Sequence, residues 1–113
     1  MDLLKDQILK LIETNGPITA QEINNHVTII AIDPIRVIRK KIRELIIEDK
    51  IPIASSMNRP FGYFIITQDA KADHYIAQLK SRIYHISERL YAFESATAKQ
   101  IQLLLLPTQE VKK

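Results

Sequence analysis

The segment Asp33–Asp49 constrains the fold most, because it carries both a clear helix start and a clear two-faced pattern. Asp33 is an N-cap acid, and Pro34 follows it at the first helical position, where the missing N–H of proline costs nothing. The apolar residues that follow recur at helical spacing: Ile35, Ile38, Ile42, Leu45 and Ile46. The segment therefore predicts a helix with a buried face, and the basic residues expected to point away from it are Arg36, Lys40, Lys41 and Arg43.

Two shorter helices are predicted before this segment. The first has apolar residues at helical spacing and ends at Asn15-Gly16-Pro17, where Gly16 suits a left-handed cap and proline prevents continuation. The second begins at Thr19-Ala20-Gln21-Glu22, which has the form of a capping box, and should cover about residues 20–25. The β-branched stretch His26–Ile32 is expected to be an extended turn or a short strand.

A β-hairpin is predicted after the basic helix. Ile51–Ser55 and Gly62–Thr67 have the composition of strands, and the polar residues 56–61 form a loop between them. Gly62 lies where this loop returns to a strand, a place that often needs a positive φ or a close approach of two backbones.

A heptad pattern dominates the stretch from Asp69 to about Lys99. Its apolar residues alternate at spacings of three and four, which is the seam of a coiled coil: Ile76, Leu79, Ile83, Ile86, Leu90 and Phe93, with Thr97 as the next position. We expect this seam to form a homodimer, with packing of the seam onto the chain's own N-terminal domain as the alternative. The predicted organisation is a domain over residues 1–68, a long helix over 69–99 and a fraying tail over 100–113.

Composition sets limits on the kind of protein. The chain has 113 residues, of which 46% are hydrophobic and 26% are charged, which is typical of a folded globular protein with one core. The net charge is only +3, so any argument about nucleic acid depends on where the charges lie. No segment resembles a signal peptide or a membrane span, and a cytoplasmic protein without membrane contact is expected.

The sequence offers little for catalysis or metal binding. Cysteine is absent, which excludes disulfides, thiolate chemistry and metal sites that need a cysteine ligand. His26, His74 and His85 are far apart and show no metal-binding spacing, and no catalytic motif or glycine-rich phosphate loop is present. We therefore expect no enzyme activity, no metal and no cofactor.

The order of elements gives a resemblance to a known family. The runs Val37–Leu45, Ile51–Ile53 and Gly62–Ile65 are similar to winged-helix domains of the biotin-repressor type, and to small phage and prophage winged-helix proteins that continue into one long helix. The implied fold class is α+β, mainly α: a winged helix-turn-helix of three helices and a two-stranded hairpin, followed by a long C-terminal helix. The chain departs from the family in a longer turn between Asn25 and Asp33, and in having Asp49-Lys50 where a glycine is usual.

The resemblance implies that the basic helix enters the major groove of double-stranded DNA and that the hairpin loop follows the adjacent backbone. Five bases occupy eight residues of that helix without an acid, although such a run is also found on ordinary solvated faces. The candidate DNA contacts are Arg36, Arg39, Lys40, Lys41 and Arg43 in the helix, with Asn58 and Arg59 in the loop. The expected function is a dimeric transcriptional regulator of phage or mobile-element origin; the alternative is a protein–protein adaptor in phage or plasmid replication.

The tail contains one further motif. Gln102–Leu106 is similar to the peptides by which bacterial replication proteins dock on the sliding clamp, with Leu106 in place of the usual aromatic residue. A leucine run after a helix more often packs on that helix or seals a dimer, so the sliding clamp is the weaker of the expected partners.

Overall fold

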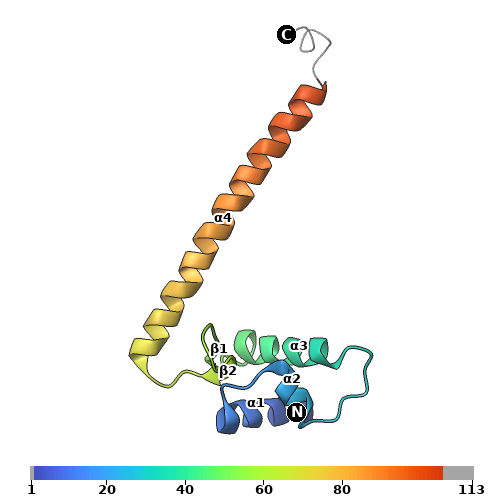
Figure 1. Cartoon of the computed structure of the whole chain (residues 1–113), viewed down its shortest axis with the longest axis vertical. Coiled ribbons are helices and arrows are strands. Elements are labelled where there is room, and N and C mark those ends of the chain that lie inside the picture. The colour runs from blue at the N-terminus through green and yellow to red at the C-terminus, as the bar shows by residue number, and fades with distance from the viewer. Residues whose placement is uncertain (1, 106–113) are drawn as a thin grey trace. The chain divides into compact units, whose positions relative to one another are not determined.

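The structure is a computed structural model that describes the backbone of residues 2–105 and the side chains of residues 2–100. It is mainly helical, with a two-stranded antiparallel sheet and a long C-terminal helix (Figure 1). The chain divides after Ala72 into two compact units, whereas the sequence analysis placed the boundary after residue 68. The elements are α1 (Leu3–Asn15), α2 (Ala20–Asn24), α3 (Pro34–Ile47), β1 (Ile53–Ser56), β2 (Gly62–Ile65) and α4 (Asp69–Leu105).

The end of α1 depends on glycine for a reason other than the predicted left-handed cap. Gly16 has φ −65° and ψ 145°, which is extended backbone, so the expectation of a left-handed residue was wrong. A Cβ atom at Gly16 would lie 2.6 Å from the carbonyl oxygen of Ile12 and 2.9 Å from that of Tyr63. Glycine is therefore required because the hairpin backbone passes close to the end of α1.

The predicted capping box of α2 is confirmed. The amide of Glu22 donates to the Thr19 hydroxyl at 3.1 Å, and the Glu22 carboxylate accepts from the Thr19 amide at 2.8 Å. After α2 the chain reaches α3 through an irregular loop, so the strand considered for His26–Ile32 does not form. Val27 and Ile29 from this loop pack against the core, but Ile30 and Ile32 are fully exposed, at 99% and 106%.

Helix α3 starts as predicted and ends two residues earlier than predicted, at Ile47. The Asp33 carboxylate accepts from the amide of Arg36 at 3.2 Å, which caps the N-terminus. Beyond the other end, Lys50 has φ 58°, a left-handed conformation that glycine adopts more readily than other residues. This residue occupies the place where the resembled family has its glycine.

The hairpin pairs Ile53 with Ile65 and Ser56 with Gly62 in antiparallel register. The strands are shorter than predicted, because β1 begins at Ile53 rather than Ile51 and β2 ends at Ile65 rather than Thr67. A third segment extends the pairing: Ile18 and Tyr63 exchange two backbone hydrogen bonds of 3.0 and 2.7 Å. Gly62 has φ +135°, and a Cβ there would lie 2.6 Å from the backbone N and O of Ile18, so both predicted reasons for glycine apply.

The core of the N-terminal unit is formed by aliphatic side chains from the three helices, from β1 and from the segment before α2: Ile8, Ile12, Ile18, Ala20, Ile23, Ile38, Ile42, Leu45 and Ile53. Helices α1 and α2 both pack on α3, and α1 also contacts β2. No polar or charged side chain of the described residues is buried in this core. The core therefore fixes α3 by one face only, and the opposite face is left to solvent.

Helix α4 is 37 residues long and ends at Leu105, beyond the predicted limit near Lys99. It belongs largely to the second unit, in which it is the one helix or strand among the described residues. Within the described residues, no helix combines the length and the apolar character needed to cross a membrane.

Candidate nucleic-acid interface

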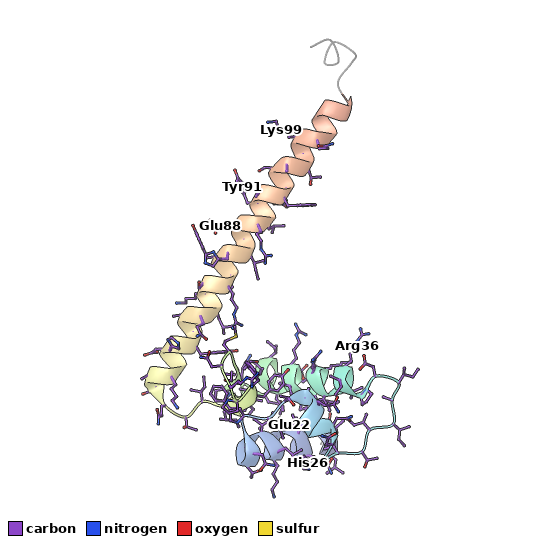
Figure 2. The ribbon with its side chains drawn as sticks, in the orientation of Figure 1. Glu22, His26, Arg36, Glu88, Tyr91 and Lys99 are labelled. Atoms are coloured by element: carbon purple, nitrogen blue, oxygen red, sulfur yellow. The ribbon has the colours of Figure 1, made fainter. Side chains whose placement is uncertain are left out.

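The exposed face of α3 is basic. Arg36, Arg39, Lys40 and Arg43 are all exposed, whereas Ile38, Ile42 and Leu45 are buried. At about 100° per residue, the four basic side chains fall within an arc of about 100° that lies opposite the buried residues. We call these four residues the basic face. Figure 2 shows Arg36 on the side of α3 that faces away from α1.

The basic face is free of competing acids within the described structure. The nearest acids along the helix are engaged elsewhere: Asp33 caps the N-terminus, and the Glu44 carboxylate lies 3.7 Å from the Lys41 ammonium. Among residues 2–100, none of the four basic side chains takes part in an ion pair or side-chain hydrogen bond. Four fixed positive charges therefore remain available to bind an anionic partner.

Lys41 does not belong to this face, which corrects the sequence-based expectation that it points away from the buried stripe. Its ammonium lies 2.6 Å from the Asp2 carboxylate and 3.7 Å from the Glu44 carboxylate, and its side chain is 24% exposed. The hydrogen bond to Asp2 raises the pKa of Lys41, and the same bond, with the one from the Lys5 amide, lowers the pKa of Asp2. Lys41 therefore ties α3 to the N-terminus of α1.

A second ion pair joins α1 and α3 at the other end of their contact. The Lys5 ammonium lies 2.9 Å from the Asp49 carboxylate, which follows the C-terminus of α3. This hydrogen-bonded contact raises the pKa of Lys5. Neither pair is predictable from the sequence, because both join residues that are far apart in the chain and their approach depends on how α1 packs on α3.

The hairpin lies next to the basic face at one point. A hollow of about 220 Å³ is lined by the N-terminus of α2, the loop end of the two hairpin strands and one residue of α3: Thr19, Ala20, Arg39, Ser55, Gly62 and Tyr63. Arg39 therefore lies beside the hairpin. Gly62 and the Ile18–Tyr63 bridge set this approach, because they hold the loop end of β2 against the chain before α2.

The two candidate residues in the hairpin loop are held by local contacts. Asn58 and Arg59 are both exposed, and the Ser56 hydroxyl donates to the backbone carbonyl of Asn58 at 2.5 Å. The Arg59 guanidinium lies 5.9 Å from the centroid of the Phe61 ring, which is a cation–π distance. The loop thus exposes one polar and one basic side chain. The contacts that hold them come from other residues of the hairpin, not from α3.

The heptad residues of α4 form a second exposed surface. The six apolar residues predicted to make a seam are exposed by 39–71%: Ile76, Leu79, Ile83, Ile86, Leu90 and Phe93. Polar contacts occupy another side of the helix, where His85 pairs with Glu88 at 3.1 Å and His74 contacts Gln78 at 3.2 Å. Figure 2 shows Glu88, Tyr91 and Lys99 projecting from one side of α4.

The tail motif extends beyond the described structure. Helix α4 continues through Gln102 to Leu105, but the side chains of this stretch and the whole of Leu106 lie outside the described residues. The sliding-clamp interpretation of Gln102–Leu106 therefore stays a prediction.

Comparison of the chain with protein-family models, with curated proteins and with solved structures gives no match. The interpretation of the two surfaces therefore depends on their geometry and charge.

Proposed function

We propose that the protein binds double-stranded DNA through a winged helix-turn-helix, with α3 as the recognition helix and the β1–β2 hairpin as the wing. The observation that carries this proposal is the basic face: four cationic side chains, without an ion-pair partner among residues 2–100, on one exposed arc of a helix whose other side is buried. An α-helix fits the major groove, where arginine can pair bidentately with guanine and lysine can hold phosphates.

The arrangement suggests a role for each group. Arg36 and Arg39 extend from the N-terminal half of α3, the part of a recognition helix that contacts base edges in helix-turn-helix proteins. Lys40 and Arg43 continue the same arc and suit the phosphates along the groove. In the hairpin loop, Asn58 and Arg59 suit the neighbouring backbone.

The α4 seam supports a dimer, and with it a regulator that binds two half-sites. Six exposed apolar residues at heptad spacing are unfavourable in water and are stabilised when a second helix covers them. Two weakly binding domains joined in one molecule raise each other's effective concentration on DNA. A dimeric DNA-binding protein of this kind would act as a transcriptional regulator.

The experiment is fluorescence anisotropy with a random duplex over a series of salt concentrations. The double variant Arg36→Ala/Lys40→Ala removes two charges from the basic face. It should weaken binding at low salt by about tenfold or more and reduce the slope of log K against log salt by about one per domain, since Lys40 is the phosphate contact of the pair and each such contact contributes about 0.9.

The matched control is Lys10→Ala/Lys99→Ala, which removes the same charge from exposed positions on α1 and α4. This control should keep the slope of the unchanged protein. Absence of binding at low salt, or equal losses in the two double variants, would remove the proposal.

A protein–protein adaptor is the second candidate, and one observation favours it. Ile30 and Ile32 are fully exposed in the loop between α2 and α3. Exposed apolar side chains that lie close together are common at protein interfaces. Under this alternative, Ile30→Ser/Ile32→Ser would abolish capture of a protein partner, and DNA binding would be absent or insensitive to salt.

A further inference from the structure

We infer that α4 pairs with α4 of a second copy in parallel and in register. This inference rests on the dimer of the proposed function, but it does not depend on DNA binding. The surface concerned is the seam of six exposed apolar residues, and the occupant is the same seam of a second chain. The charged residues that flank the seam distinguish the parallel from the antiparallel orientation.

The parallel arrangement places each seam residue against its own counterpart. Ile76, Ile83 and Leu90 then share one set of positions, and Leu79, Ile86 and Phe93 share the other. The first heptad has isoleucine at the first position and leucine at the fourth, which is the combination that favours parallel two-stranded coils. Every apolar residue of the seam meets an apolar residue.

The flanking charges agree with this orientation. In a parallel coil, a residue just before a seam position approaches the residue five places later in the partner. Arg89 is then next to Glu94 of the partner subunit, and the pair occurs twice because of the symmetry. Lys80 meets the partner's Tyr75, and Arg82 meets the partner's Ser87, so no like charges oppose each other at these positions.

The antiparallel alternative brings like charges together. The alignment that pairs all six apolar residues sets Ile76 against the partner's Phe93 and Ile83 against the partner's Ile86. Arg82 then approaches the partner's Arg89, and Asp73 approaches the partner's Glu94. These pairs occur twice each, and like charges at flanking positions are unfavourable.

Sliding the antiparallel helices by one heptad does not solve this problem. Lys80 would then meet the partner's Glu94, but Arg89 would meet the partner's Arg89 across the symmetry axis. In addition, Ile76 would face the partner's Gln100, which is polar, so apolar contact is lost at both ends. Parallel pairing is the orientation that keeps apolar contacts along the seam and avoids like charges at the flanking positions.

The orientation has a consequence for the DNA partner. Each N-terminal unit is joined to the Asp69 end of its α4 by residues 66–68. A parallel coil brings the two Asp69 ends together, so two α3 basic faces are attached at the same end of the dimer. The partner is therefore a single duplex that carries two neighbouring half-sites, rather than two separate duplexes.

Disulfide trapping tests the orientation directly, because the chain has no cysteine of its own. In the Ile76→Cys variant, the two introduced sulfurs face each other in a parallel dimer and form a disulfide under mild oxidation. In the antiparallel alignment that pairs all six residues, they are about 25 Å apart, because 17 residues separate Ile76 from Phe93 at about 1.5 Å per residue.

We expect most of the Ile76→Cys protein to become a covalent dimer. Leu90→Cys should give the same result, and it tests the orientation independently if Ile76→Cys weakens the coil. Tyr91→Cys, on the outer side of α4 and 75% exposed, is the control and should stay monomeric on denaturing gels. The inference is overturned if neither seam variant cross-links, or if Ile76→Cys links only to a tagged Phe93→Cys chain. Either outcome leaves DNA binding by the basic face to be judged separately by anisotropy.

Discussion

At the scale of single residues, neighbouring lysines in α3 have different roles because one step along a helix turns a side chain by about 100°. Lys40 projects from the exposed side, while Lys41 turns toward α1 and pairs with Asp2. The charge run alone does not separate the two, but the helical angle does: Lys41 falls close to the buried stripe of Ile38 and Leu45. A count of bases in the segment therefore overstates the charge that can face a ligand.

The Asp2–Lys41 pair predicts a specific dependence of stability on pH. Because folding lowers the pKa of Asp2, its contribution is present above its ordinary value of 3.8 and is lost as the pH falls through the lower folded value. Because folding raises the pKa of Lys41, its contribution is present below 10.5 and is lost as the pH rises through the folded value.

Asp2→Asn should therefore lower the stability of the protein slightly at neutral pH and flatten the loss of stability between about pH 5 and pH 2. The effect should be small and should shrink with added salt, since the pair is partly exposed. Urea unfolding at several pH values measures it. An unchanged acid limb in the variant would show that the pair does not contribute.

At the scale of elements, the sequence predicts what is decided locally. The caps at Thr19 and Asp33 and the need for glycine at position 62 follow from neighbouring residues, and the structure confirms them. The predicted buried stripe of α3 is confirmed at Ile38, Ile42 and Leu45, but Ile46 is 36% exposed. The contacts that escaped prediction are those between distant segments. The Ile18–Tyr63 bridge and the approach of the hairpin to Gly16 depend on tertiary packing, which no local pattern encodes.

The end of α3 offers a test of one such element. Lys50 has φ 58°, which costs a residue with a Cβ about 1–2 kcal/mol relative to glycine. Lys50→Gly should relieve this strain, offset in part by the greater freedom of glycine in the unfolded chain, and stabilise the protein by about 0.5–1 kcal/mol. Urea denaturation measures the change, and a loss of stability would mean that the bond from the Lys50 ammonium to the Ile47 carbonyl, 2.8 Å long, matters more than the strain.

Helix α4 offers a matched pair of substitutions. Ile83 and Tyr84 are adjacent and almost equally exposed, at 63% and 61%, but only Ile83 lies in the seam. Ile83→Lys should convert the dimer into a monomer, because the charge would be buried between the helices. Tyr84→Lys should leave the dimer intact. Sedimentation equilibrium measures both masses, and a dimer that survives Ile83→Lys would rule out this seam.

At the scale of the whole molecule, the chain combines a folded N-terminal unit that carries an exposed basic face with a long helix that carries an exposed apolar seam. The net charge of +3 hides this division, because 16 basic and 13 acidic residues nearly cancel over the full length. Only the folded arrangement shows that four bases share one arc of α3 without a partner among the described residues. The proposed function follows from that local concentration of charge.

The most direct test of DNA binding by the basic face is an NMR titration of the uniformly ¹⁵N-labelled protein with a random duplex at low salt. If the basic face binds DNA, the largest amide shifts occur in α3 around Arg36, Arg39, Lys40 and Arg43 and in the hairpin loop at Asn58 and Arg59. The outer side of α4, at Tyr91 and Lys99, should stay unchanged. Absence of shifts at any DNA concentration, or shifts confined to α4 with α3 unperturbed, would contradict DNA binding by the basic face.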